Sequence, residues 1–388
     1  MTRVVFLLNL DKSWMGGVNY YKNLLQAIGE YAGERLSVLV LVPKGADICL
    51  LGELPSSIEV RKSAMVTRGS VPWFLRKVLI KLLKRDYMLS RYLKGQGVSV
   101  LSHYGEAASC PGLKILSWIP DFQEKHCPAF FMVEEISSRD RDHLRQAQMS
   151  DAVILSSHNA AQDFARFYAA YKDKAAVLQF VPTMTYTGAV DGDVLERYGL
   201  PEKFFFLPNQ YWAHKNHKIV LEALAALKEI GEGEDIVVVS TGGTEDYRNP
   251  THIEELRAYI RNRQLEESYR ILGMIPYADV QSLAKLCHAY INPSFFEGWS
   301  TTVEEAKYQG KCILLSDIGI HREQNPKHGV FFNPNDAREL AGKMLEVWTA
   351  PRVETDIAEL KSYYETMRKK FAEDYVKIVE SVRISSFL

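Results

Sequence analysis

The chain has 388 residues and a formal net charge of −1, and 47% of its residues are hydrophobic. This length exceeds one ordinary hydrophobic core and predicts two domains, while the balanced charge gives the whole molecule no electrostatic preference for nucleic acid. The five cysteines show neither C-x-x-C spacing nor the pattern of a disulfide framework. We therefore expect a protein of a reducing compartment, the cytoplasm.

Short apolar runs alternate with helical periodicity along the first half of the chain. The predicted strands are RVVFLLNL, LSVLVLV, KILSWIP, DAVILSS and AAVLQFVP, at residues 3–10, 36–42, 114–120, 151–157 and 175–182. The first run leads directly into Asp11 and Lys12, so it predicts a strand rather than a signal peptide. No apolar run approaches the roughly 20 residues that a membrane-spanning helix needs.

A Gly-Gly pair, Gly16 and Gly17, follows the first run where a loop enters a helical segment. Glycine there lets backbone N–H groups approach an anion at the helix end that favours negative charge. A plain turn explains the pair equally well. The pair is not part of a G-x-G-x-x-G, so the dinucleotide-binding fingerprint is absent.

Residues 71–94 form a basic and apolar segment, with seven Lys or Arg against one acid, Asp86. A basic amphipathic helix of this composition can lie on an anionic membrane surface. The alternative is an ordinary helix whose apolar stripe packs on the core. The sequence leaves both interpretations open, but it disfavours nucleic acid, because no second basic patch or aromatic stacking motif accompanies the segment.

The second half repeats the alternation. Its predicted strands are KFFFLPN, DIVVVST, YRILGMI, HAYINPS and KCILLSD, at residues 203–209, 235–241, 269–275, 288–294 and 311–317. Continuous apolar strands that are each followed by a helix are typical of parallel sheets covered on both faces. Two such sets predict two doubly wound α/β domains, over 1–185 and 186–365, with the changeover in the polar stretch 182–202.

Polar residues that follow these strands are candidates for a ligand site, because open α/β sheets bind ligands at the carboxyl ends of their strands. Lys215 and Asn216 stand at a predicted helix start, where a lysine can hold a diphosphate or can simply be solvated near a cap. His214 and His217 flank them without a carboxylate or cysteine partner nearby. We therefore expect no metal site.

Two carboxylates, Glu297 and Glu305, follow the run 288–294, the first in a predicted loop and the second in a predicted helix. Between them stand Gly298, Trp299, Ser300 and Thr301. Thr301 with Glu304 fits a capping box, and free N–H groups at the helix start can hold phosphate oxygens. Glu305 can accept hydrogen bonds from a ribose diol. The alternative is two surface glutamates, one of which favours its helix N-terminus.

The stretch PSFFEGWSTTVEEAKYQGKCILLSD resembles the E-x7-E region of the family 4 retaining glycosyltransferases, whose fold is GT-B. The stretches LPNQYWAHKNH, WIPDFQEKHCPAFF and DIGIHREQNP resemble the same family, so the resemblance runs from Gly16 to about Asn335. It implies two Rossmann-like domains that face each other across a cleft. It also implies that a C-terminal helix, about 366–388, crosses back to the first domain.

The resemblance also implies roles for the residues of the second half. Glu305 would hold the ribose hydroxyls and Glu297 the hydroxyls of the donor sugar. Lys215 would bind the diphosphate, together with Gly17 and the backbone of residues 299–301. Asn209 stands where many members have an arginine, and Ser300 where many have the second glycine of E-G-F-G.

In the first half, Pro120-Asp121 replaces the His-Asp pair of many family members. The resemblance therefore leaves open whether Asp121 or His126 faces the sugar, and Glu124 stands where relatives often have histidine. Family members generally work without a divalent ion, so we expect neither a metal nor a cofactor.

The sequence thus predicts a retaining transferase that moves a hexose or deoxyhexose from a nucleotide sugar to a glycan. The expected acceptor is a lipid-linked intermediate of a surface polysaccharide. If residues 71–94 lie on the membrane rather than pack on the core, the protein reaches this acceptor at the inner membrane face. GDP-mannose, UDP-hexoses and dTDP-rhamnose remain open as donors. Two other classes stay possible: a nucleotide-sugar epimerase of the same fold, and a non-catalytic glycan-binding or assembly subunit.

Overall fold

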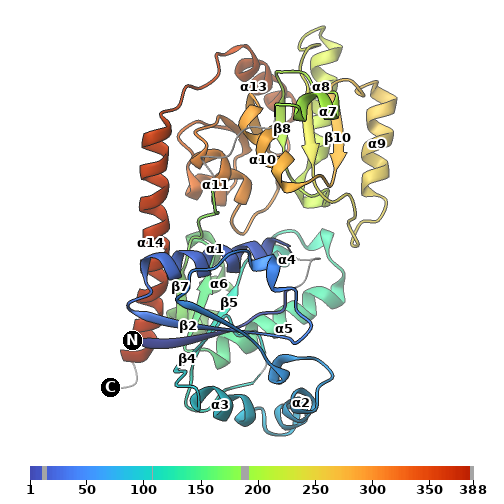
Figure 1. Cartoon of the computed structure of the whole chain (residues 1–388). Helices are drawn as coiled ribbons and strands as arrows, with labels where there is room; N and C mark the ends of the chain where they lie inside the picture. Colours follow the sequence, from blue (N-terminus) through green and yellow to red (C-terminus); the bar gives the residue numbers. More distant parts are fainter. Residues whose placement is uncertain (11–14, 107, 185–191, 385–388) are drawn as a thin grey trace. The chain divides into compact units, whose positions relative to one another are not determined.

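The structure is a computed structural model that describes residues 1–10, 15–106, 108–184 and 192–384 (Figure 1). The chain divides into two compact units. Unit 1 comprises Met1–Phe122, Glu134–Thr183 and Glu365–Leu388, and unit 2 comprises Gln123–Val133 and Met184–Tyr364. The predicted boundary at 185/186 lies outside the described residues.

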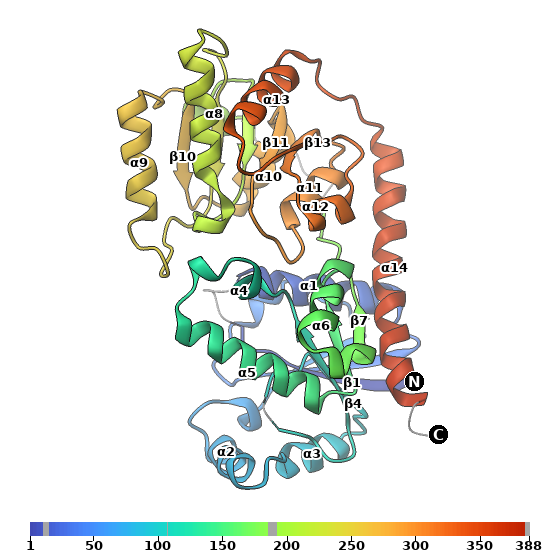
Figure 2. The same ribbon diagram turned by 180° about the vertical axis from the view of Figure 1, so that it is seen from behind.

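Unit 1 is built on a seven-stranded parallel sheet of order β3-β2-β1-β4-β5-β6-β7. Its strands are β1 (Thr2–Leu7), β2 (Leu36–Val42), β3 (Ile58–Lys62), β4 (Val100–Ser102), β5 (Lys114–Ile119), β6 (Ala152–Leu155) and β7 (Ala175–Val177). Its helices are α1 (Met15–Tyr31), α2 (Val71–Leu83), α3 (Tyr87–Lys94), α5 (Val133–Met149) and α6 (His158–Phe167). Helices α5 and α6, which lie side by side in Figure 2, pack on β5 and β6 through Ala147, Phe164 and Val153.

Unit 2 has a six-stranded parallel sheet of order β10-β9-β8-β11-β12-β13. Its strands are β8 (Phe205–Leu207), β9 (Val238–Thr241), β10 (Tyr269–Gly273), β11 (Ala289–Asn292), β12 (Ile313–Ser316) and β13 (Gly329–Phe332). Its helices are α4 (Gln123–His126), α7 (Val194–Tyr198), α8 (His217–Glu229), α9 (His252–Arg263), α10 (Tyr277–Leu286), α11 (Thr301–Tyr308), α12 (Gly319–Gln324) and α13 (Ala337–Thr349). The prediction of two doubly wound parallel sheets is confirmed.

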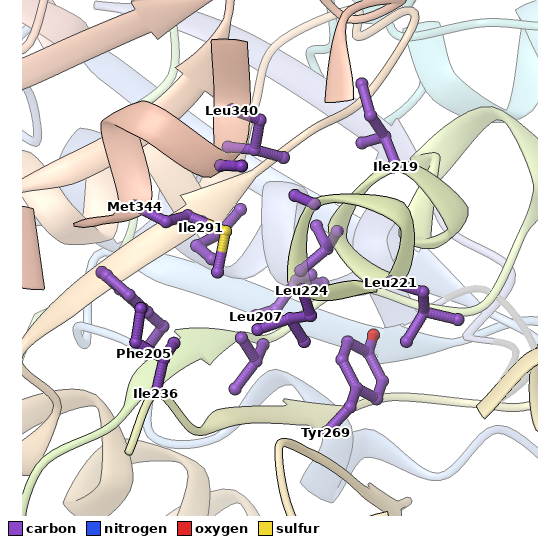
Figure 3. Packing of buried hydrophobic residues seen from close by; sticks show 14 of the residues in the cluster. Phe205, Leu207, Ile219, Leu221, Leu224, Ile236, Tyr269, Ile291, Leu340 and Met344 are labelled. Atoms are coloured by element: carbon purple, nitrogen blue, oxygen red, sulfur yellow. The ribbon is translucent and has the colours of Figure 1, made fainter. Parts of the chain in front are cut away.

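The hydrophobic core of unit 2 fixes the position of α8 against the sheet. Leu207 and Ile291 of the central strands pack against Leu224 of α8 and Met344 of α13 (Figure 3). All four side chains are almost fully buried, and each buried aliphatic side chain of this size stabilises the fold by about 1.5–3 kcal/mol. This packing places the first residues of α8 at the carboxyl edge of the sheet.

The last helix, α14 (Ile357–Ile384), belongs to unit 2 up to Tyr364 and to unit 1 from Glu365 onward. Within unit 1 it is held by polar contacts. Both carboxylate oxygens of Glu380 accept hydrogen bonds from Arg35 at 2.7 Å, and the Tyr375 hydroxyl donates to Ser102 at 2.8 Å.

The segment 123–133 belongs to unit 2. Aromatic contacts account for this. The ring of His126 stacks on Phe296 with centroids 5.1 Å apart, and Phe130 stacks on Phe295 at 6.4 Å.

The basic segment 71–94 forms two helices, so the prediction of a single helix is wrong. Helix α2 ends at Leu83, and its C-cap, Lys84, has a left-handed φ of 54°. Asp86 then caps α3, because its Oδ1 accepts a hydrogen bond from the Leu89 backbone at 2.9 Å. None of the helices within the described ranges is both long and apolar enough to span a membrane.

Candidate functional site

Polar side chains meet at the carboxyl ends of three adjacent strands in the middle of the unit 2 sheet, β8, β11 and β12. Asn209 follows β8, Asn292 ends β11 and Ser316 ends β12. The Asn209 amide donates to Asn292 at 3.2 Å, and its oxygen accepts from Thr302 of α11 at 3.0 Å. These strand ends therefore form one hydrogen-bonded edge, which is where open parallel sheets bind ligands.

The loop after β9 closes on this edge through a glycine. Gly242 has a φ of 141°, and a Cβ atom there would lie 2.5 Å from the carbonyl oxygen of Asn209. Only glycine tolerates both conditions. Its presence lets the loops after β8 and β9 approach each other and holds Asn209 in the network.

An ion pair between Lys215 and Glu297 lies beside the network. The Lys215 ammonium donates to both carboxylate oxygens of Glu297, at 2.7 and 2.8 Å, and the Ser294 hydroxyl donates to the same carboxylate at 2.7 Å. The Glu297 side chain is 8% exposed and the Lys215 side chain 19%. Burial acts to raise the pKa of Glu297, but the charge of Lys215 and these hydrogen bonds outweigh it and lower the pKa. Glu297 is therefore ionised at neutral pH.

Helix α11 begins one loop further on, and Ser300 caps it. The Ser300 hydroxyl accepts from the Val303 backbone at 3.4 Å and from the Asn292 amide at 2.7 Å. The predicted capping box of Thr301 and Glu304 is wrong, because the cap lies one residue earlier. Glu304 is instead buried and accepts from Lys307 at 3.0 Å and Gln324 at 2.9 Å. The first N–H groups of α11, at Thr301 and Thr302, have no partner within a helix and can receive an anion.

Glu305 lies one turn into α11 and is half-buried. Burial raises its pKa to about 7. Among the described residues no side chain donates a hydrogen bond to its carboxylate; its electrostatic neighbours are the phenols of Tyr277 and Tyr290. A partly desolvated carboxylate without a donor is stabilised by a ligand that brings hydroxyl donors.

His321 is a residue of this edge that the sequence analysis missed. Its side chain is fully buried, and Nδ1 lies 2.8 Å from the Ser316 carbonyl oxygen, so Nδ1 carries the proton. Burial lowers the pKa of His321 to about 4 and keeps it neutral, although the charge of Glu297 acts in the opposite direction. Its Nε2 atom has no partner within the described residues and remains a free acceptor.

The strand-end rule, applied to the predicted strands 288–294 and 311–317, would also have found Asn292, Ser294 and Ser316. Nothing in the sequence marks Gln324, which lies in α12 and reaches Ser300 and Glu304 through the fold.

The other predicted residues of unit 2 have mainly structural contacts. Asn216 has a left-handed φ of 56°, and its amide donates to the carbonyl oxygens of Pro293 and Pro334 at 3.1 and 3.0 Å. The ring nitrogens of His217 contact the Tyr269 hydroxyl and the Gln210 carbonyl oxygen. Within the described part of the chain, no group of three His, Cys, Asp or Glu side chains is placed to hold a metal ion.

The structure thus brings together Asn209, Lys215, Glu297, Ser300 and the start of α11, with His126 beside the neighbouring Phe296. Gly298 and Trp299 belong to the loop that joins Glu297 to Ser300. Three predicted residues belong to unit 1 instead. Gly16 and Gly17 lie in the first turn of α1, directly after residues 11–14, which are outside the description, and Asp121 follows β5.

Comparisons with known proteins define the class of this fold. HepE of Anabaena, solved with UDP and glucose, superposes with a TM-score of 0.66 at 16% identity over 100% of both chains. The lipopolysaccharide outer core galactosyltransferase WaaB superposes with a TM-score of 0.60 at 16% identity, over 99% of this chain and 100% of that one. The predicted GT-B fold class, with two Rossmann-like α/β domains, is confirmed.

Comparisons of the sequence itself find a matching protein family within unit 2 and a curated relative. Residues 196–362 match the family "Glycosyl transferases group 1", a range that includes Lys215, Glu297 and Glu305. A stretch of 237 residues is 23% identical to the serotype-specific mannosyltransferase WbdA of Escherichia coli. That alignment covers 59% of this chain and 28% of WbdA, so the chain spans less than a third of this curated relative.

Proposed function

We propose that this protein is a retaining glycosyltransferase of family 4, which moves a hexose or deoxyhexose from a nucleotide sugar to a glycan acceptor. The observation that carries the proposal is the Lys215–Glu297 pair at 2.7 Å beside the N-terminus of α11, with Glu305 one turn further along that helix. A cation and free N–H groups suit a diphosphate, and two carboxylates suit the hydroxyl groups of two sugars.

In this mechanism the bond between the anomeric carbon and the diphosphate breaks while the sugar acquires oxocarbenium character. An acceptor hydroxyl bonds to the same carbon from the same face and gives its proton to the departing phosphate. Lys215 has three N–H donors, of which two bind Glu297, so one remains for a phosphate oxygen. The N–H groups of Thr301 and Thr302 and the positive end of α11 stabilise the growing negative charge. Glu297 holds hydroxyl groups of the transferred sugar, and Glu305 holds those of the ribose. Because these groups supply the positive charge, we propose that the reaction needs neither a metal ion nor a cofactor.

We further propose a lipid-linked surface-polysaccharide intermediate as acceptor and a cytoplasmic location. The names of WbdA and WaaB, which act in mannosyl and lipopolysaccharide galactosyl transfer, support the choice of acceptor. The five scattered cysteines, which show neither C-x-x-C spacing nor the pattern of a disulfide framework, support a reducing compartment.

The raised pKa of Glu305 predicts how the affinity for the nucleotide depends on pH. We expect the affinity for a nucleoside diphosphate to rise with pH and to level off above about pH 7, because the ionised Glu305 carboxylate accepts hydrogen bonds from ribose hydroxyls more strongly than the protonated acid does. Below pH 7 the affinity should fall by about tenfold per pH unit. Above pH 7 the Glu305→Gln variant should bind about 10–100-fold more weakly than the wild type, with a flatter profile. The ratio of the two affinities, measured by calorimetry from pH 5.5 to 8.5, removes the ionisation of the nucleotide's own phosphate.

The raised pKa of Glu305 makes the folded state less stable as pH rises. The folded pKa of Glu305, about 7, lies above its ordinary value, so the folded state prefers the protonated form. This contribution to stability is fully present below the ordinary pKa and is lost as pH rises through about 7.

If the ratio of the wild-type and Glu305→Gln affinities for the nucleoside diphosphate did not change with pH, Glu305 would not bind the nucleotide.

Product analysis tests the transfer itself. The full chain is incubated with UDP-glucose, GDP-mannose or dTDP-rhamnose and a bacterial lipid extract, and lipid-bound sugar is measured with its anomeric configuration by NMR. Transfer with the configuration of the donor supports the proposal. Release of a free epimerised sugar would favour an epimerase, and binding of a nucleotide sugar without any product would favour an assembly subunit.

A further inference from the structure

Helix α2 presents an apolar stripe to solvent rather than to the core. Val71, Phe74, Leu75, Val78 and Leu82 recur at the spacing of one helix face, and all five are exposed. Phe74 is 61% exposed and Leu82 73%. The alternative in which the stripe of this segment packs on the core is therefore wrong for α2.

A buried ion pair explains how α2 is held with its apolar face outward. Arg76 is one of the largest fully buried side chains, and its guanidinium donates twice to Asp86 Oδ2, at 2.6 and 2.9 Å. It also donates to the Met65 carbonyl oxygen, while Ser70 caps the helix. The inward face of α2 is thus anchored by polar contacts, and the apolar stripe has no partner among the described residues of unit 1.

The charges around the stripe have one sign. Lys81, Lys84 and Arg85 are exposed at the end of α2, and Lys77 pairs with Glu106. The only acid in 71–94, Asp86, is 1% exposed and neutralised by Arg76. Since the whole chain has a net charge of −1, this cationic character is local to α2. Lys81, Lys84 and Arg85 have no carboxylate partner among the described residues, and an exposed apolar stripe beside such positive charge is complementary to an anionic bilayer surface.

The opposite side of α2 borders a cavity of about 640 Å³ at the carboxyl edge of the unit 1 sheet. Trp73 and Arg76 line it from α2, Arg68 from the preceding loop, and Tyr104 and Glu106 from the loop after β4. In Figures 1 and 2, α2 and α3 lie beside one another in unit 1. One helix therefore separates the exposed apolar stripe from a cavity large enough for a sugar.

We propose that α2 docks on an anionic membrane surface, with its apolar stripe in the headgroup region and Lys81, Lys84 and Arg85 against anionic headgroups. Docking in this orientation holds the cavity next to the bilayer. The membrane contact stands independently of the catalytic assignment. Only the use of the cavity for the sugar end of a lipid-linked acceptor rests on the proposed function.

Vesicle flotation tests the docking. The full chain is mixed with phosphatidylcholine vesicles, with or without phosphatidylglycerol, and the floated fraction is measured. We expect flotation with the anionic vesicles alone, weakened by salt. The Phe74→Ser/Leu82→Ser variant and the Lys81→Gln/Lys84→Gln/Arg85→Gln variant should each lower the partition coefficient by about 100-fold. A matched control, Ile230→Ser/Ile357→Ser, changes two exposed apolar residues of unit 2 and should float like the wild type.

Several results would overturn the proposal. They are equal flotation with neutral and anionic vesicles, no flotation at all, and unchanged flotation of both α2 variants. A wild-type dimer that dissociates in the Phe74→Ser/Leu82→Ser variant would show instead that a second copy of the chain covers the stripe. Because flotation needs no turnover, its failure in a protein that still binds a nucleoside diphosphate would leave the proposed function intact.

Discussion

Replacing Lys215 with methionine should lower kcat by about 10²–10³-fold, the usual cost of removing one group that stabilises the charge of a transition state. Lys215 supplies the one side-chain cation hydrogen-bonded to Glu297 in the described site, and methionine keeps the length of the side chain without its charge. The effect should fall mainly on kcat, because the negative charge on the diphosphate grows as the sugar departs. Steady-state kinetics with the natural donor measure both constants.

Two variants separate this role from a structural one. Lys218→Met removes a lysine near the same helix start, but its side chain is 63% exposed and pairs with Glu222, so kcat should be unchanged. Glu297→Gln keeps the size of the partner and leaves Lys215 charged, so it should weaken donor binding as well as turnover. Equal kcat values for Lys215→Met and Lys218→Met would exclude Lys215 from the chemistry.

Removal of the Asp86 carboxylate should destabilise unit 1 by about 3–5 kcal/mol, because Asp86→Ala leaves the buried Arg76 charge without its partner. The same carboxylate caps α3 at Leu89, so the variant also loses a helix cap. Urea denaturation of the full chain, followed by hydrogen exchange in α2 and α3, measures the loss in unit 1 separately from unit 2.

A double-mutant cycle gives this prediction a control. Arg76→Met together with Asp86→Ala should cost less than the sum of the single changes, because no buried charge then remains unpaired. Asp142→Ala, at a 55% exposed side chain paired with Arg145, should change stability by less than about 0.5 kcal/mol. Strictly additive effects of the two buried changes would show that Arg76 and Asp86 do not depend on each other.

The strands that the sequence analysis predicted are continuous apolar runs, whereas it missed β3, β4 and β13. Strand β13 is an edge strand of only four residues. Strand β4 is three residues long, and β3 is an edge strand that carries Glu59, Arg61 and Lys62. Neither gives a continuous apolar run of strand length. Edge strands commonly carry charged side chains, which discourage pairing with another chain and also hide the strand from pattern analysis.

The candidate site likewise has residues that the sequence predicts and contacts that only the fold creates. Lys215 and Glu297 were predicted separately from their positions after strands, but 82 residues separate them, so their contact depends on β8 and β11 being neighbours in the sheet. The partners of Ser300 and Glu304 come from α12, which no local pattern connects to α11. Helix α2 shows a further limit, because periodicity reveals an apolar stripe but not whether it faces inward. In α2 the buried Arg76–Asp86 pair holds the helix so that its apolar stripe faces outward.

The most direct test of the central claim is thermal stabilisation of the full chain by UDP, GDP, dTDP and CDP, each alone and without added metal. At about 100 times its dissociation constant, the nucleotide of the natural donor should stabilise the fold by about 2.7 kcal/mol. We predict that one of the four nucleotides stabilises the fold clearly more than the others, and that much of this stabilisation is lost in the Glu305→Gln variant. No stabilisation by any of the four nucleotides would contradict the assignment of a nucleotide-sugar site to Lys215, Glu297 and Glu305.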